Sequence, residues 1–312
     1  MDVDFALTAF LTGWLAATVR LAGPLLLAAL GELFAERAGV LNIGIEGVML
    51  LGALVAWWAA WSTGSLWLGM LGGMAAGLTA GGFLGFMYVT AQASQVVVGV
   101  IFNIFALGLA SYAYRLILGG ASGAQTAVMF SVLPIPLLSE IPFLGPILFR
   151  HTPLVYLTAL VAAGAWFVLR RTSFGLNLRA VGENPRAADT AGLDVTAYRY
   201  AGVLISCVAA GAAGAYLVLA QVGQFRETVV SGQGFIALAI VIFGRWDPLR
   251  AAIAALIFGA ADALQLTLQI FTSGVPPQLL LALPYLVTIL AMSGLIGKAD
   301  QPESLMVPYS RE

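Results

Sequence analysis

The charged side chains, which are the groups best able to do chemistry, are concentrated in one part of the sequence. Residues 170–199, RRTSFGLNLRAVGENPRAADTAGLDVTAYR, hold eight of the 29 charged residues of the chain. Five of the eight are arginines, and the others are Glu183, Asp189 and Asp194. This density of charge favours a segment in water, either a solvated linker or a surface that a soluble partner grips.

The residues that enzymes use most often are scarce. His151 and Cys207 are the only histidine and cysteine, so the sequence offers neither a Cys/His metal cluster nor a disulfide framework. The HExxH and GxSxG motifs are missing. The only lysine, Lys298 in GLIGKAD, lacks the GxxxxGK[ST] spacing of a phosphate-binding loop. We therefore expect no catalytic residue, no metal and no cofactor in this chain, and no ATPase of its own.

The composition indicates that lipid surrounds most of the chain. The 312 residues are 61% hydrophobic and 9% charged, with a mean hydropathy of +0.96, whereas soluble domains are roughly 25% charged. Apolar stretches of about 20 residues recur along the sequence, and their continuous rather than alternating pattern predicts helices. The net charge of −1 provides no basic field for nucleic acid.

We therefore expect an all-α polytopic membrane protein, a single domain over residues 1–312 with a C-terminal tail at 297–312. It should have about eight full transmembrane helices and one short or re-entrant helix. The short one is GFIALAIVIFG, residues 234–244, because 11 residues cannot cross about 30 Å of hydrocarbon as a regular helix. The full spans are expected at 9–31, 43–61, 66–91, 96–118, 153–169, 200–221, 249–271 and 277–296.

Two segments carry local signals of their own. In the third span, glycines follow one another at intervals of four from Gly69 to Gly85, a ridge that lets another helix approach closely. Residues 120–152 contain four prolines within LPIPLLSEIPFLGP, which exclude a regular helix. We expect an outer loop there, with a re-entrant or interfacial piece.

The basic residues predict the orientation. If residues 170–199 are cytoplasmic, alternation of the spans places about ten basic residues inside and three outside, in agreement with the positive-inside rule. Arg20 falls within the first span and counts for neither side. The N-terminus is then outside and the C-terminus is cytoplasmic.

A polar interruption, AGVLNIGIEGVMLLG, marks the expected inner start of the second span. Asn42 and Glu46 lie in it, and a carboxylate at or below membrane depth usually faces a partner or a water-filled cavity. Glu46 is therefore a candidate for the solute path or its inner gate. The alternative is that Glu46 stabilises a helix N-terminus through the helix dipole and touches no solute.

A few other polar residues are candidates for the path. Asn103 lies in the middle of the fourth span, and Gln233 precedes the short helix. Asp262, Gln265 and Gln269 follow at i, i+3 and i+7, hence roughly on one face of a helix. The alternative for the amides is an interhelical hydrogen bond, worth about 0.6 kcal/mol on average.

The charged segment contains a short helix of its own. In RAVGENPRAADTAGLDV, Asn184 and Pro185 form a helix-entry signal, and Gly192 is placed to end the helix after about two turns. This motif resembles the cytoplasmic coupling loop of binding-protein-dependent ABC importers of the branched-chain amino acid, simple sugar and nucleoside permease superfamily. There GxNPxAAxxAG marks the helix that docks on the ATPase subunit.

Within that superfamily, residues 31–56, GELFAERAGVLNIGIEGVMLLGALVA, look most like the nucleoside-type permeases, whose first block reads ERxGxxNIGxEGxMLxGA. Residues 232–259 add a third block in the same order. The resemblance implies a permease subunit that provides half of a path for nucleosides, with simple sugars and branched-chain amino acids as alternatives. It places the ATPase-docking surface in residues 170–199, at Gly182, Glu183, Asn184, Pro185, Ala187, Ala188, Gly192 and Leu193.

The resemblance also implies the partners: a second homologous permease, a cytoplasmic ATPase that uses ATP and Mg²⁺, and an external binding protein. From another class, an ion-coupled secondary transporter is the alternative, because broken helices at membrane depth are compatible with it. The glycine-bounded runs ending at Gly52 and Gly244 fit an inverted repeat, in which the segments around 42–47 and 233–238 line the inner and outer parts of one route.

Overall fold

The computed structural model describes residues 3–119, 129–271, 282, 286 and 301–310, and these are predominantly helical. Seven described segments are long and apolar enough to cross a membrane, in agreement with seven of the expected spans. The eighth expected span, 277–296, lies almost wholly outside the described residues. The seven are Leu7–Arg37, Ile45–Thr63, Leu66–Thr90, Gln95–Leu118, Pro153–Arg171, Val195–Val222 and Pro248–Gln269.

The helices that contain these spans differ from the expected limits by a few residues at one or both ends. The largest difference is α1 (Val3–Arg37), a single helix of 35 residues, whereas the sequence predicted a span over 9–31. Its excess at the end places two glutamates inside a helix rather than in a loop. The others are α2 (Ile45–Thr63), α3 (Leu66–Gly85), α4 (Gln95–Leu118), α6 (Pro153–Arg171), α9 (Val195–Tyr216) and α11 (Pro248–Phe271), and π-helical turns Phe86–Thr90 and Leu217–Val222 extend α3 and α9.

The shorter elements include the expected short apolar helix and the proline-rich segment. The apolar helix α10 (Gln233–Phe243) has 11 residues. In the described part of the proline-rich segment there is no long helix: β1 (Leu133–Pro134) pairs antiparallel with β2 (Arg150–His151), and a 3-10 turn (Leu138–Glu140) and α5 (Leu144–Leu148) lie between them. The charged segment forms α7 (Ser173–Glu183) and α8 (Pro185–Thr190).

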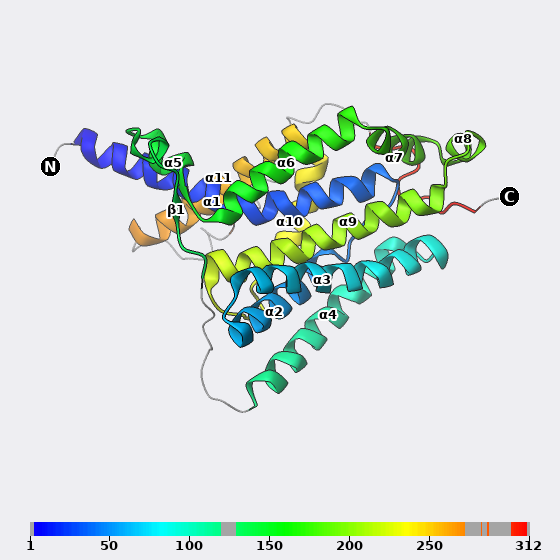
Figure 1. The fold of residues 1–312 in the computed structure, drawn as a ribbon, viewed down its shortest axis with the longest axis horizontal. Coiled ribbons are helices and arrows are strands. Elements are labelled where there is room, and N and C mark those ends of the chain that lie inside the picture. Colours follow the sequence, from blue (N-terminus) through cyan, green and yellow to red (C-terminus); the bar gives the residue numbers. More distant parts are fainter. Residues whose placement is uncertain (1–2, 120–128, 272–281, 283–285, 287–300, 311–312) are drawn as a thin grey trace.

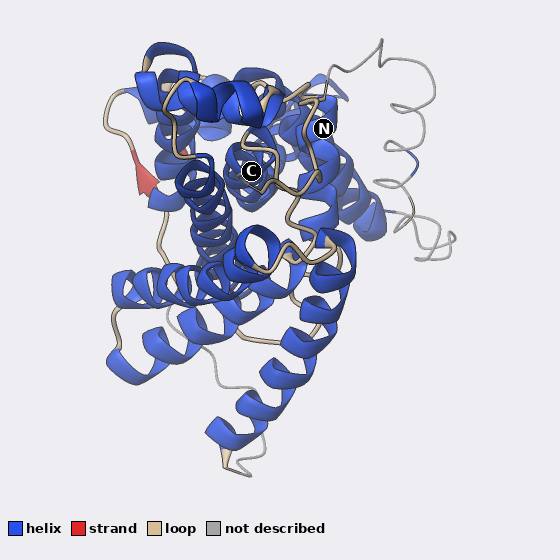
Figure 2. Ribbon diagram, turned by 90° about the vertical axis from the view of Figure 1, so that its right-hand side faces the viewer, coloured by secondary structure: helices blue, strands red, loops and turns tan. Residues whose placement is uncertain are grey.

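The long helices form a bundle with two distinct ends. Figure 1 shows α5 and the β1–β2 pair at one end, beside the start of α1, and α7, α8 and the C-terminal tail at the other. The view from the tail end in Figure 2 shows that α4 leans away from the rest of the bundle, as it does in Figure 1. Elements that the sequence assigns to opposite sides of the membrane are therefore at opposite ends.

The glycine ridge of α3 packs against α9, as its spacing predicts. A Cβ on Gly73 would come within 3.0 Å of the carbonyl oxygen of Gly211, and one on Gly81 would meet the side chain of Cys207 at 2.8 Å. Glycine on both helices thus brings the two backbones close together, where dispersion contacts hold helices in lipid.

Two helices begin after loops that fold back into the bundle. The loop between α1 and α2, residues 38–44, returns along α1, because the backbone N–H of Asn42 donates to Glu32, five positions before α1 ends. The loop before α10, residues 223–232, likewise leads to a helix that starts inside the bundle. Gly39 and Gly232 take left-handed φ values of 86° and 87° in these loops, a conformation that glycine adopts at little cost.

Candidate functional site

The starts of α2 and α10 meet at the carboxylate of Glu46. Its Oε1 accepts the backbone N–H of Gly232 at 2.7 Å, and its Oε2 accepts that of Gly234 at 2.7 Å. Gly232 is the N-cap residue of α10 and offers no side-chain acceptor. The cap of α10 is therefore supplied by Glu46 of α2. The same carboxylate, in the first turn of α2, also lies at the positive end of the α10 dipole.

The contact requires a glycine at position 234. A Cβ there would lie 2.8 Å from both the backbone and a carboxylate oxygen of Glu46. Real Cβ atoms do not come that close to other heavy atoms, so any side chain would push α10 away from α2.

Asn103 of α4 forms hydrogen bonds on both sides of the point where α2 begins. Its Oδ1 accepts the backbone N–H of Gly47 at 2.8 Å, and its Nδ2 donates to the carbonyl oxygen of Ile43 at 2.9 Å. Both polar ends of the amide are thus used within the protein. This is the interhelical hydrogen bonding that the sequence left open as the alternative to a solute contact.

Asn42 belongs to a fully buried polar network. Glu32 accepts the backbone N–H of Asn42 at 2.8 Å and the hydroxyl of Ser206 at 2.6 Å. The Asn42 amide donates to Ser206 and to Cys207, and it accepts a long bond of 3.4 Å from Tyr88. The network ties the loop 38–44 to α1 and α9.

Sequence reasoning did not single out Glu32 or Glu36. Both are buried, with 0% and 1% of their surface exposed. Their signal was present, because two glutamates four positions apart lie on one face of a helix. The expected span ended at residue 31, so both were left outside the membrane helix.

The six predicted path residues fall into two groups. Asn42, Glu46, Asn103 and Gln233 lie around the start of α2 and the start of α10. The Oε1 of Gln233 is buried and has no hydrogen-bond partner in the described part of the chain. Asp262 and Gln265 lie apart from this group on α11, which packs mainly against α1. Contact of any of them with a solute stays a prediction.

The predicted helix of the charged segment is present, with the predicted limits. The side chain of Asn184 accepts the backbone N–H of Ala187 at 3.0 Å, and Pro185 occupies the first turn of α8. Gly192 follows the helix with φ 87°. The local sequence alone therefore accounts for α8.

The structure divides the predicted docking residues between two faces. Ala187 is exposed, whereas Ala188 is only 4% exposed and packs with Val181 and Val195. Gly182 is buried too, at a close approach to the end of α1. Of the predicted docking residues, Glu183, Asn184, Ala187 and Gly192 are exposed, and Pro185 and Leu193 are half-buried.

The C-terminal tail, residues 301–310, lies across this region. The backbone N–H of Ser304 donates to Gly182, and that of Met306 donates to Gly39, at 3.0 and 3.1 Å. The hydroxyl of Tyr309 donates to Asp189 of α8 at 2.9 Å. The tail therefore joins the loop 38–44 to α7 and α8, a contact that no sequence pattern indicated.

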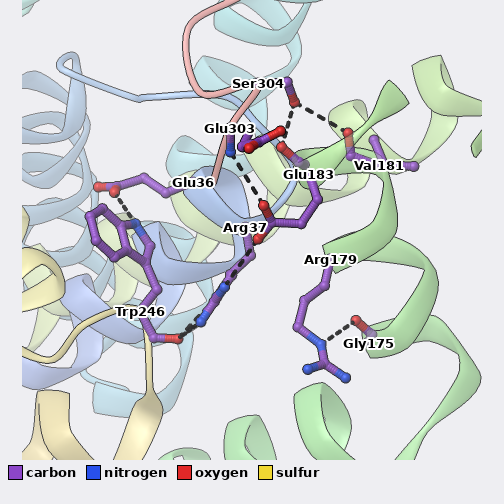
Figure 3. Close-up of polar contacts among 10 residues, drawn as sticks. Glu36, Arg37, Gly175, Arg179, Val181, Glu183, Trp246, Glu303 and Ser304 are labelled. Atoms are coloured by element: carbon purple, nitrogen blue, oxygen red, sulfur yellow. Dashed lines mark hydrogen bonds and ion pairs between the residues drawn. The ribbon is translucent and has the colours of Figure 1, made fainter. Parts of the chain in front are cut away.

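At the same end of the bundle, ionic contacts and hydrogen bonds connect the ends of several helices. Figure 3 shows Arg37, the last residue of α1, between Glu183 of α7 and Trp246 of the α10–α11 turn. Next to Trp246, Asp247 pairs with Arg170 and accepts the backbone N–H groups of Leu249 and Arg250. Burial raises the pKa of the Asp247 carboxyl, but these hydrogen bonds outweigh it and hold the pKa below its usual value.

No group of metal-ligating side chains exists among the described residues. The starts of two helices, α2 and α10, meet at one carboxylate, and a capped, partly exposed helix lies at one end of the bundle. Irregular backbone at membrane depth is tolerated where it is buried in protein or lines a cavity, and transporters use discontinuous helices for solute paths.

Comparisons with known proteins show the family of the chain. Residues 14–292 match the family described as branched-chain amino acid transport system / permease component. The guanosine ABC transporter permease protein NupQ of Bacillus subtilis is 40% identical over 94% of this chain and 95% of its own length. The nucleoside ABC transporter permease protein NupC of Lactococcus lactis is 37% identical over 92% and 93%.

One further relative is named for a different solute, and another is named again for guanosine. The putative glucose ABC transporter permease protein TsgC13 of Haloferax volcanii is 36% identical over 97% of this chain and 99% of its own. A second guanosine permease protein of Bacillus subtilis, NupP, is 29% identical over 84% of this chain and 76% of its own. No solved structure shows a significant match.

Proposed function

The chain belongs to the family of permease components of branched-chain amino acid transport systems, and we propose that the solute it carries is a nucleoside. It is a non-catalytic, multi-pass membrane subunit of an ABC importer, which works with an ATPase and a binding protein. The observation that carries the nucleoside proposal is the similarity, along nearly the whole chain, to two permeases named for guanosine and for nucleosides.

A sugar is the second candidate, because TsgC13 is named for glucose and is nearly as similar. An uptake assay distinguishes the two candidate solutes. It uses the complete importer in proteoliposomes, with the binding protein outside. We expect ATP-driven accumulation of radiolabelled guanosine, with glucose at background. Accumulation of glucose but not guanosine would reverse the assignment.

The permease functions as half of a pair, and its partner is a second, different permease. Bacillus subtilis has two guanosine permease proteins, NupP and NupQ, and this chain is similar to both at very different identities. Two such chains would enclose the path between them. A tag on this chain should therefore co-purify the second permease, and a transport-competent complex with this permease alone would contradict the pairing.

The path follows the starts of α2 and α10. The loops 38–44 and 223–232 enter the bundle and lead to α2 and α10, whose starts meet at Glu46. An inverted pair of this kind gives one side of the membrane access to one loop and the opposite side access to the other. Glu46 then holds the two halves together in the conformation described here.

The end of the bundle that carries α7, α8 and the tail faces the cytoplasm, and the start of α1 faces outward. The distribution of basic residues supports this orientation. The ATPase docks on α8, whose exposed residues form a small surface at that end of the bundle.

A further inference from the structure

The turn between α10 and α11, residues 244–247, is held by hydrogen bonds to the end of α1. The indole Nε1 of Trp246 donates to Glu36 Oε2 at 2.5 Å. The carbonyl oxygen of Trp246 accepts from Nε and Nη2 of Arg37 at 3.1 and 2.9 Å. Trp246 itself is only 4% exposed. Two consecutive residues of α1 therefore hold both the side chain and the backbone of one residue (Figure 3).

The backbone of this turn is strained. Arg245 and Trp246 have φ values of 50° and 53°, in the left-handed region that side chains other than glycine rarely adopt. Two such residues in succession persist only where surrounding contacts fix them, and strain of this kind is common in switch regions. The contacts from Glu36 and Arg37, together with the backbone hydrogen bonds of the turn, fix it here.

The same arginine reaches the segment that leads to α8. Nη1 of Arg37 lies 3.8 Å from Oε1 of Glu183, the last residue of α7. The next residue, Asn184, caps α8. On the other side of α7, Arg170 in the last turn of α6 pairs with Asp247 of the turn. Both ends of the α7 region therefore contact the α10–α11 turn directly or through Arg37.

The turn is also one end of α10, and Glu46 holds the other. A helix of 11 residues is about 16 Å long and moves as one body. A displacement of the turn therefore changes the position of Gly232 and Gly234 against Glu46, where the hydrogen bonds are only 2.7 Å long.

We propose that Arg37 and Trp246 are positioning residues that couple the α7–α8 segment to α10, so that ATPase movement at α8 displaces α10 from Glu46. This rests on the proposed docking of the ATPase at α8. The test measures this coupling directly.

The test uses the complete importer in lipid nanodiscs and proteoliposomes, with Arg37→Lys, Trp246→Phe and the double variant. Lysine keeps the charge and loses the two-pronged contact with the Trp246 carbonyl. Phenylalanine keeps the ring and loses the donor to Glu36. Arg115→Lys and Trp58→Phe are matched controls, because Arg115 lies at the far end of α4 and Trp58 is 47% exposed on α2.

Three quantities are measured: ATPase co-purification, guanosine taken up per ATP hydrolysed, and the ATP-dependent change in labelling of Gln233→Cys in a Cys207→Ser background. We expect each single variant to retain the ATPase and to lower uptake per ATP about fivefold, the scale of 1 kcal/mol of coupling. The labelling change should shrink equally, and the double variant should lose little more than either single one.

Normal uptake per ATP and a normal labelling change in Arg37→Lys and Trp246→Phe would overturn the proposal. Ala187→Arg distinguishes this failure from failure of the docking assignment. If Ala187→Arg releases the ATPase while the Arg37 and Trp246 variants transport normally, only the coupling proposal is wrong. If Ala187→Arg leaves the ATPase bound and uptake normal, the docking assignment is wrong.

Discussion

Glu46 and Gly234 are 188 positions apart in the sequence, yet a carboxylate oxygen of the first lies 2.7 Å from the backbone nitrogen of the second. The neighbouring oxygen bonds Gly232 in the same way. One side chain thus satisfies the N-terminus of a helix in the other half of the chain, and this contact joins the start of α2 to the start of α10.

Removal of the Glu46 carboxylate should weaken that contact. Hydrogen bonds to a charged group are worth about 1.5–3 kcal/mol each, so Glu46→Ala should lower the thermal midpoint of the purified subunit. Glu46→Gln keeps an acceptor without the charge and should have an intermediate effect. Differential scanning fluorimetry in detergent measures both variants. An unchanged midpoint for Glu46→Ala would show that the contact does not hold the helices.

Two glycine-to-alanine changes should have opposite effects. At position 234 the added Cβ would collide with Glu46, and overpacking of this kind costs about 1–3 kcal/mol. At position 108, inside α4, the Cβ meets no atom within 4 Å, and alanine gains up to about 1 kcal/mol of helix propensity. The midpoint should fall for Gly234→Ala and hold or rise for Gly108→Ala. The reverse order would contradict the packing described for α10.

The two alanines of α8 should also differ. Ala187 is exposed, so Ala187→Arg should leave the thermal midpoint unchanged while the tagged subunit no longer co-purifies the ATPase. Ala188 is buried against Val181 and Val195, so Ala188→Arg should destabilise the α7–α8 region itself. Pull-down and fluorimetry on the same preparations separate the two effects. A bound ATPase in Ala187→Arg would place the docking surface elsewhere.

The two alanines show what sequence reasoning could reach. The cap, the first-turn proline and the terminal glycine of α8 are local signals, and they gave its limits correctly. The inward direction of Ala188 depends on Val195 and on the tail residue Tyr309, which a motif does not reveal. In the same way, the spacing of glycines in α3 predicted a close helix contact but not that α9 makes it.

The junction at the end of α1 was missed for a related reason. Glu36, Arg37 and Trp246 are brought together only by the return of α10 toward the end of α1, some 209 positions later in the sequence. Hydropathy predicted α10 as an apolar run too short to be a full span. It could not show that Glu46 would cap α10, because a long-range cap leaves no periodic pattern in the sequence.

The C-terminal tail should stabilise α8 through Tyr309. Its hydroxyl donates to Asp189, a bond to a carboxylate worth about 1.5 kcal/mol, which corresponds to roughly tenfold in local exchange. Hydrogen–deuterium exchange of the intact importer should therefore be faster over residues 185–190 in Tyr309→Phe. Tyr112→Phe is the control, because Tyr112 is 68% exposed on α4. Equal exchange rates over these residues in the two variants would show that the tail does not stabilise α8.

In the proposed path, the start of α2 and the start of α10 line one route and open to opposite sides in turn. Thiol labelling of the reconstituted importer tests it most directly, with Ile43→Cys and Gln233→Cys made separately in a Cys207→Ser background. We expect both cysteines to react with an aqueous maleimide, and we expect ATP to change their rates in opposite directions. Uniform inaccessibility at both positions, or equal rates with and without ATP, would contradict the claim and leave the two segments as packing elements.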